Sequence, residues 1–214
     1  GRFGGVTMDV DDEFLRRTAD FCDYFKRRLG EFDELVTDNV IYQQRTKDVG
    51  VISSDLIQDY ALSGPVLRAA GVAHDVRKTE PYGGYDRFDF DVPVGQRGGD
   101  CFDRHSVRME EMRQSLRIID QALACLPDGP IMAAKVPKRI RPPAGDHYFA
   151  VESARGHFGM LITSDGTDIP VRHKLRTPSF VNVSTMPVVL PGTMLADTVA
   201  ILGSIDIVVP EIDR

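Results

Sequence analysis

Tryptophan is absent from this chain of 214 residues, and cysteine is scarce. The three cysteines, Cys22, Cys101 and Cys125, are far apart and odd in number, and no two of them form a C-x-x-C pair. This pattern fits neither a disulfide framework nor a self-contained metal site. We therefore predict three small, buried thiols in a protein of a reducing compartment.

Long hydrophobic runs are also missing. No apolar stretch reaches the roughly 18 residues that a membrane-spanning helix needs, and the chain shows no signal peptide. We expect a cytosolic or peripheral protein. The opening residues, Gly1-Arg-Phe-Gly-Gly-Val6, lack an initiator methionine and resemble the middle of a domain, so we also expect a fragment or one piece of a larger fold.

Positive charge is in the minority. The formal net charge is -6 and the sequence pI is about 5.4, which argues against nucleic acid as a partner. Basic residues gather in one proline-rich stretch, 135–146. We predict that this stretch is an extended surface linker, either solvated or in contact with an acidic partner.

Self-sufficient catalytic motifs are not found. The chain has no G-x-S-x-G, no H-E-x-x-H and no Walker sequence, and its five histidines are dispersed. The glycines of residues 1–5 are not followed by the Lys-Ser/Thr pair of a phosphate loop. We therefore predict no metal site and no redox centre carried by this chain alone.

Apolar residues recur at helical spacing in two long segments. The first predicts a helix from about residue 12 to 36, and the second predicts a bundle helix that ends at Pro127-Asp-Gly-Pro130. The two stripes are Phe14, Phe21, Phe25, Leu29 and Phe32, and Met109, Met112, Leu116, Ile119, Leu123 and Leu126. Shorter helices are predicted at 54–62, 63–71 and 190–202, with the last apolar helical run broken at Gly203-Ser204.

Strand patterns lie mainly in the second half of the chain. Earlier in the chain, 49–54 fits a short connection or strand, and 85–92 fits a strand or an extended loop. Segments 147–152, 158–163 and 171–175 predict a β-ribbon over 147–176. The predicted fold class is mainly α with a small β-ribbon (α+β). We divide the chain into a helical bundle part (1–134), the linker (135–146), and a β-ribbon with a C-terminal helix and tail (147–214).

The tail contains an isolated acid, Asp206, among β-branched residues. A carboxylate in apolar surroundings is costly unless it is paired or functional. Each sequence motif upstream of Asp206 is weak evidence for a family when taken alone; Arg155-Gly156, for example, also fits a plain turn. The order in which the motifs occur along the chain is specific. The ordered motifs are Arg2-Phe-Gly-Gly-Val6, Leu62-Ser-Gly-Pro-Val-Leu-Arg-Ala-Ala-Gly71, Tyr85-Asp-Arg-Phe-Asp-Phe-Asp-Val-Pro93, Arg108-Met-Glu-Glu-Met-Arg-Gln-Ser-Leu-Arg-Ile-Ile119, Glu152-Ser-Ala-Arg-Gly-His-Phe-Gly159, Ser164-Asp-Gly166, Lys174-Leu-Arg-Thr-Pro-Ser-Phe-Val-Asn182, Gly192-Thr193 and Asp197-Thr-Val-Ala-Ile-Leu-Gly-Ser-Ile-Asp206.

This order resembles the family of the D subunit, the quinone-site subunit of proton-pumping NADH:quinone oxidoreductase (respiratory complex I). The resemblance covers nearly the whole chain but only the C-terminal half or so of the family. It implies the C-terminal part of the fold that this family shares with the large subunits of nickel–iron hydrogenases. In those relatives a C-terminal Asp-Pro-Cys-x-x-Cys motif binds the metals, whereas Val208 and Glu211 stand at the two cysteine positions here. The resemblance therefore excludes nickel–iron chemistry at this end.

The resemblance implies a quinone pocket beside the subunit that carries the terminal iron–sulfur cluster. Asp206 would be the catalytic residue, supplying charge or a proton path, although a structural hydrogen-bonding acid remains an alternative. Val208 would form an apolar wall of the quinone pocket. Glu211, Arg214 and Arg155 would give ionic support behind it.

The same resemblance implies the assembly. Quinone would be a substrate, with NADH, flavin and iron–sulfur clusters on partner subunits. The partners would be the iron–sulfur B subunit, the C subunit and the membrane-embedded H subunit, in a complex on the cytoplasmic side of the cell membrane that this chain joins peripherally. Two alternatives remain open: a subunit of a related membrane-bound hydrogenase-like or ferredoxin-linked complex, and a non-catalytic scaffold paralogue.

Three departures from the family pattern are visible. The histidine and tyrosine that hydrogen-bond the quinone headgroup in the family lie on an N-terminal β-hairpin, which this sequence does not contain. A helix that many members carry between Pro130 and His147 is missing. His157 replaces the usual glutamate after Arg-Gly, and Val209-Pro210 replaces a Phe-Gly pair.

Overall fold

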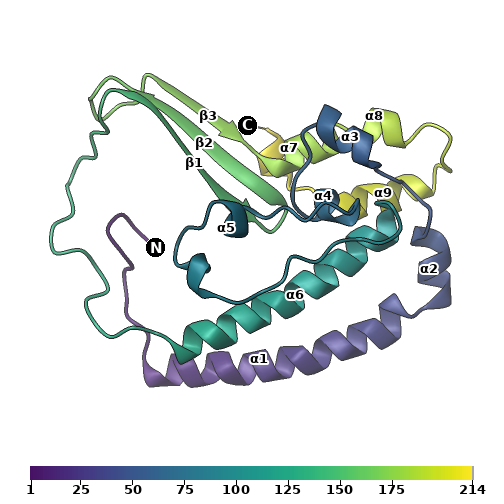
Figure 1. The fold of residues 1–214 in the computed structure, drawn as a ribbon, viewed down its shortest axis with the longest axis horizontal. Coiled ribbons are helices and arrows are strands. Elements are labelled where there is room, and N and C mark those ends of the chain that lie inside the picture. The colour runs from purple at the N-terminus through teal and green to yellow at the C-terminus, as the bar shows by residue number, and fades with distance from the viewer. Residues whose placement is uncertain (214) are drawn as a thin grey trace.

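The computed structural model describes residues 1–213 and joins two long helices to a three-stranded sheet through a group of short helices (Figure 1). The helical elements of the first part are α1 (Asp12–Phe32), the π-helix η1 (Asp33–Thr37), α2 (Val40–Thr46), α3 (Ser54–Asp59), α4 (Gly64–Ala69), α5 (Val76–Thr79), the 3-10 helix η2 (Tyr85–Arg87) and α6 (Cys101–Ala124). The second part contains β1 (Gly145–Ser153), β2 (Gly156–Ser164), β3 (Arg172–Arg176), α7 (Pro178–Val183), α8 (Met186–Val189), α9 (Asp197–Ile205) and α10 (Val209–Ile212). The predicted class, mainly helical with a small β-ribbon, is confirmed.

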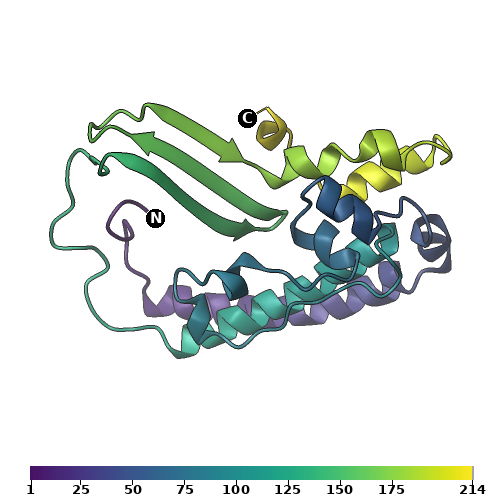
Figure 2. The same cartoon turned by 45° about the horizontal axis from the view of Figure 1, so that its top comes forward.

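The two long helices, α1 and α6, lie side by side along one edge of the molecule (Figures 1 and 2). Their apolar stripes meet in a small core of Cys22 and Leu29 from α1 and Met109 and Leu116 from α6. α6 starts well before its predicted seam, because the side chain of Asp100 caps it by accepting a hydrogen bond from the Asp103 N–H at 2.7 Å. The helical prediction for both segments is confirmed.

A second core lies where the short helices meet the C-terminal region. Ile52 and Val66 from the 52–70 segment pack with Ile201 and Ile205 of α9. The predicted short helices at 54–62 and 63–71 are present as α3 and α4. This core fixes α9 against α6, which is the contact that builds the candidate site.

The sheet is antiparallel in the order β1-β2-β3, which confirms the predicted ribbon. It extends away from the helices, and the irregular segment 125–144 loops out before it (Figure 2). Side chains alternate between its faces. The division of the chain into three parts at 134 and 146 stays a prediction.

Two local predictions were wrong, and a third was settled between its alternatives. α9 continues through Gly203 and Ser204 to Ile205, and it begins only at Asp197 because Pro191 cannot donate a backbone hydrogen bond and Gly192 has φ +85°. Segment 85–92, predicted as a strand or an extended loop, forms the short η2 turn and an extended stretch. Cys22 and Cys101 are buried as predicted, whereas Cys125 is exposed because it follows the end of α6.

Within residues 1–213, no helix is both long enough and apolar enough to cross a membrane.

Candidate functional site

The predicted acid lies directly after the last turn of α9. Asp206 is the C-cap of this helix and has the left-handed backbone conformation, with φ 57° and ψ 60°. Its backbone N–H donates to the Gly203 carbonyl at 3.1 Å. Aspartate tolerates this conformation better than β-branched residues do. The helix therefore stops here, and the Asp206 carboxylate is placed beyond its end.

Two arginines of α6 hold the same helix end. Arg104 Nε donates to Ser204 Oγ at 2.9 Å. Arg108 donates from Nη1 to the Ser204 carbonyl at 2.7 Å and from Nη2 to the Ile205 carbonyl at 3.2 Å. The last carbonyls of a helix lack partners within the helix, and cations near them are stabilising. Arg108 thus satisfies two terminal carbonyls of α9, and Arg104 binds the side chain of Ser204 beside them.

A third arginine reaches Asp206 from the β1–β2 turn. Arg155 donates from Nε to the Asp206 carbonyl at 3.0 Å and from Nη2 to Asp206 Oδ1 at 3.2 Å. The turn packs directly on α4: a Cβ atom built at Gly64 would lie 2.4 Å from the Arg155 carbonyl oxygen. Glycine at 64 and 156 permits this backbone contact, which places Arg155 over the end of α9.

A hollow of about 300 Å³ opens beside Asp206, between α2, α6 and α9. This volume is at the lower end of the range for ligand pockets. We call it the Asp206 hollow; its walls are formed by Tyr42, Thr46, Cys101, His105, Arg108, Val199, Ala200, Gly203, Ser204 and Asp206. The surroundings of the acid are therefore not packed solid.

Three arginines, Arg104, Arg108 and Arg155, contact the end of α9, and of these Arg108 lines the Asp206 hollow itself. Asp206 is ion-paired with Arg155, but among residues 1–213 neither Arg104 nor Arg108 forms a salt bridge. Burial lowers the pKa of Arg108 to about 10, so this guanidinium stays charged at neutral pH. Burial also lowers the pKa of His105, which favours its neutral form there. A group that gains negative charge would be stabilised at this wall.

The other predicted tail residues lie around Ser179. The backbone N–H of Val208 donates to Ser179 Oγ at 3.1 Å, and the carboxylate of Glu211 accepts hydrogen bonds from the Ser179 N–H and hydroxyl. Val208 is half-buried and is not among the residues that line the Asp206 hollow. Arg214 lies outside the described residues. The structure thus brings Asp206 and Arg155 together, and it joins Val208 to Glu211 through a serine.

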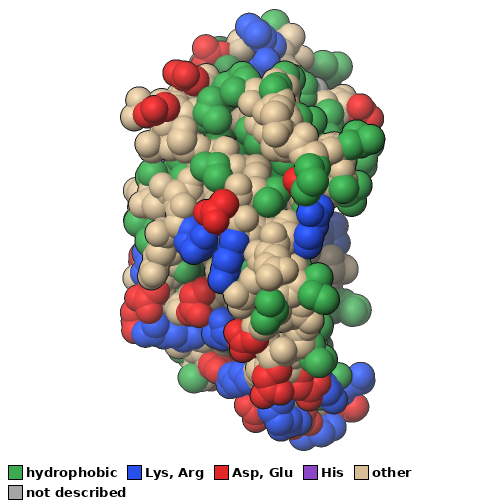
Figure 3. Space-filling view, turned by 90° about the vertical axis from the view of Figure 1, so that its right-hand side faces the viewer, with side chains coloured by type: hydrophobic (Ala, Val, Ile, Leu, Met, Phe, Trp, Pro, Cys, Tyr) green, Lys and Arg blue, Asp and Glu red, His purple; other side chains and the backbone are tan. Residues whose placement is uncertain are grey.

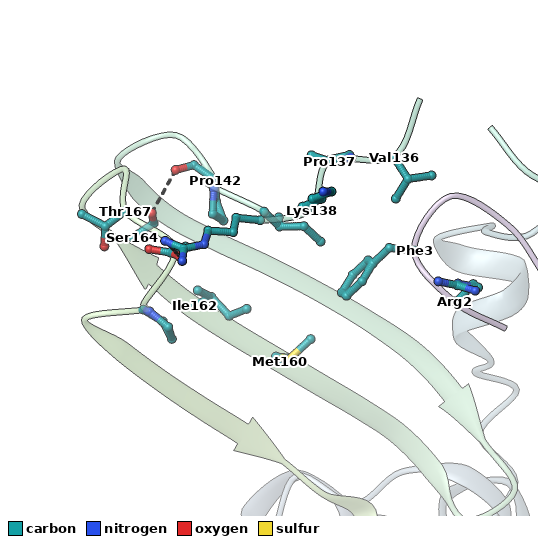
Figure 4. A pocket seen from close by; sticks show the side chains of 14 residues that line it. Arg2, Phe3, Val136, Pro137, Lys138, Pro142, Met160, Ile162, Ser164 and Thr167 are labelled. Atoms are coloured by element: carbon teal, nitrogen blue, oxygen red, sulfur yellow. Dashed lines mark hydrogen bonds and ion pairs between the residues drawn. The ribbon is translucent and has the colours of Figure 1, made fainter. Parts of the chain in front are cut away.

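A larger hollow, of about 880 Å³, lies elsewhere (Figure 4). The N-terminal residues Arg2 and Phe3, the 136–142 segment and one face of the sheet, with Met160 and Ile162, surround it. The acid on its wall, Asp168, lies 3.5 Å from Arg139. This hollow can accept apolar groups, but it does not contain the predicted acid, and we favour the Asp206 hollow as the site of chemistry.

Comparison with known proteins identifies the family. The family model for the 49-kDa subunit of respiratory-chain NADH dehydrogenase matches residues 1–140 and 134–214. The chain belongs to this family. It is 51% identical over 213 residues to the D subunit of NADH-quinone oxidoreductase from Syntrophobacter fumaroxidans, 49% identical over 212 residues to that of Desulforamulus reducens, and 49% identical over 213 residues to that of Desulfotalea psychrophila.

These alignments cover 99–100% of this chain but 57% of each relative. The chain thus spans somewhat more than half the length of the members of the 49-kDa subunit family that it matches. The resemblance seen in the sequence is confirmed at the level of the family.

Three residues that line the Asp206 hollow, Tyr42, His105 and Arg108, were not predicted from the sequence. Cys101, His105 and Arg108 follow one another on α6 at steps of four and three, so they share a helix face. That spacing in the sequence could have indicated a shared polar face on α6. It is easily overlooked because polar residues beside an apolar helix stripe normally face solvent.

Proposed function

We propose that this chain forms part of the quinone-binding pocket of a membrane-associated NADH:quinone oxidoreductase, with Asp206 beside the quinone headgroup. The observation that carries the proposal is the open hollow at Asp206, in a chain of the 49-kDa subunit family. An apolar wall with a few converging polar groups is the usual composition of a small-molecule site.

Quinone reduction consumes two electrons and two protons. In this reaction the residues of this chain would position the quinone ring and would handle protons and charge. Asp206 would supply charge or a proton path, and Arg155 orients its carboxylate. Val208 would add an apolar wall and Glu211 would support it through Ser179, with Arg214 as further ionic support.

The remaining parts of the reaction would lie on partners. Electrons would come from NADH through flavin and iron–sulfur clusters, the last of them on the B subunit, with the C subunit and the membrane-embedded H subunit completing the surroundings. Figure 3 views the end of the molecule at which α2 and α9 lie, and hydrophobic side chains are spread over its upper half. Ile41, Leu195 and Val199 are 72%, 90% and 77% exposed, which favours a surface covered by partners. The complex would meet the membrane on its cytoplasmic side, with this chain peripheral.

The test is Asp206→Asn in the complete complex, with Asp213→Asn as the control. Both carboxylates are near the chain end, but only Asp206 lines the hollow. We expect Asp206→Asn to lower quinone reductase activity by about tenfold or more, the effect of one charged hydrogen bond, and to change inhibitor sensitivity. NADH oxidation by ferricyanide, which needs no quinone, should be unchanged.

One observation favours a second candidate, a scaffold that kept the fold without the chemistry: Asp206 already has a structural partner in Arg155. Unchanged quinone reductase activity and inhibitor sensitivity in Asp206→Asn would support that scaffold and refute the proposed pocket.

A further inference from the structure

The guanidinium of Arg108 has unused hydrogen-bonding capacity beside the Asp206 hollow. An arginine carries five N–H donors. Those of Arg108 reach the carbonyls of Arg104, Ser204 and Ile205, at 2.9, 2.7 and 3.2 Å. Its Nε atom is one of two buried side-chain polar atoms without a partner among residues 1–213. A buried donor without a partner is costly, so it invites an acceptor.

The partners of Arg108 are all neutral backbone oxygens, so its charge is not cancelled by direct contact. Its position is also well defined, because those carbonyls belong to α6 itself and to the last turn of α9. A fixed cation with free donors at the wall of a small hollow suits a ligand oxygen that gains negative charge. A quinone carbonyl oxygen does so on reduction.

The rest of the lining of the hollow is suited to a flat ring. Val199 and Ala200 of α9 contribute apolar surface, and the rings of Tyr42 and His105 meet edge to face with centroids 5.0 Å apart. His105 Nε2 is held by Thr37 Oγ1 at 2.9 Å. The ring positions are therefore set before any ligand enters.

We propose that Arg108 is a substrate-positioning residue that hydrogen-bonds one carbonyl oxygen of the quinone headgroup in the Asp206 hollow. This inference rests on the proposed function and adds a residue to it. The balance of the reaction is unchanged: the quinone takes up two electrons, supplied by the iron–sulfur donor, and two protons. Arg108 transfers neither, and its role is to hold the oxygen on which negative charge develops.

The first experiment uses the complete complex carrying Arg108→Lys, with Arg117→Lys as the matched control. Arg117 is on the same helix but pairs with Asp89 and Asp91 in a half-exposed position. Lysine keeps the charge but not the planar fork of donors. With decylubiquinone and menadione as substrates, we expect the KM for quinone to rise roughly tenfold or more in Arg108→Lys. Arg117→Lys should leave KM unchanged, and neither variant should alter ferricyanide reduction.

Substitution of Gly203 tests whether the hollow binds quinone, and it removes no polar group. A Cβ atom added there meets no atom within 4 Å, and Gly203 is part of the wall. We expect Gly203→Leu to raise the quinone KM by filling the hollow, whereas Gly30→Leu, at an exposed position of α1 where an added Cβ also meets no atom, should leave KM unchanged.

The outcomes separate the two proposals. If Gly203→Leu or Asp206→Asn alters quinone kinetics and Arg108→Lys does not, the role of Arg108 is refuted and the proposed function stands. If none of the three has an effect, both are refuted. Should Arg108→Lys fail to assemble, the unmodified complex decides: bound carbonyl-labelled quinone should show one C=O infrared stretch lowered relative to the other, and two equal frequencies would refute the inference.

Discussion

Two groups of charged residues meet the long helix α6, and they differ in how the charges of their arginines are compensated. Near the middle of α6, Arg68 lies buried among three carboxylates, 2.6 Å from Glu111, 2.8 Å from Glu152 and 3.7 Å from Asp75. Near the start of α6, Arg104 and Arg108 bond backbone carbonyls, Ser204 and Cys101. The first group, which we call the Arg68 cluster, is closed. The second borders an open hollow.

This difference in charge compensation indicates that Arg68 has a structural role and that Arg108 is suited to binding a ligand. Burial alone would lower the pKa of Arg68, but the charges of Glu111 and Glu152 outweigh it and raise that pKa. For Arg108 burial prevails and the pKa falls to about 10. The charge of Arg68 is compensated by the carboxylates that it contacts, whereas Arg108 contacts only neutral carbonyls, so its charge is available to a ligand in the hollow.

The largest effect should come from breaking the Arg68 cluster. Arg68→Met leaves the carboxylates of Glu111, Glu152 and Asp75 without their shared cation, and removing one partner of a buried pair costs about 3–5 kcal/mol. Arg104→Met is the comparison: it removes a buried cation whose partners are neutral, so we expect a smaller loss, roughly 1–3 kcal/mol. Urea unfolding of the chain measures both. An equal or greater loss in Arg104→Met would contradict the distinction between the two groups.

The second prediction concerns pH and Glu111. Burial raises the pKa of the Glu111 carboxyl above its ordinary 4.5, against the opposing charge of Arg68. The folded chain then holds this proton more tightly than the unfolded chain, so the contribution of Glu111 to the free energy of unfolding falls as pH rises from 4.5 through the raised pKa.

The variant Glu111→Gln has no such dependence. We therefore expect its destabilisation relative to the unmodified chain to be greatest near pH 4.5 and to shrink toward neutral pH. Urea unfolding at several pH values provides the measurement. A difference that grows with pH would mean that the Glu111 pKa is lowered instead.

The smallest effect should appear at the ion pair beside the hollow. Arg155 and Asp206 have side chains that are 30% and 42% exposed, so solvent screens their attraction. We expect Asp206→Asn to change the free energy of unfolding by no more than about 1 kcal/mol, while it lowers quinone reductase activity. A loss of several kcal/mol would instead assign Asp206 a structural role like that of Asp75 in the Arg68 cluster.

Sequence patterns predicted the helices α1 and α6 and the three strands because their signals are local. Periods of 3.6 and 2 reflect which residues of one segment face a core, and they can be counted along the chain. The ordered motifs were enough to place the chain in its family. The end of α9 was predicted too early, since Gly203 and Ser204 suggested a break that the packing of Ile201 and Ile205 overrides.

The composition of the site depended on contacts between distant segments. Asp206 was singled out from its apolar neighbours, but its partner Arg155 is 51 residues away and Arg108 is 96 residues from the Ser204 carbonyl that it caps. Local spacing shows which side chains share a helix face and not which other helix that face meets. The crossing of α6 with α9 and the glycine contact between α4 and the β1–β2 turn bring the three arginines to the end of α9. These packing contacts, and no local pattern, therefore determine the charges around the hollow.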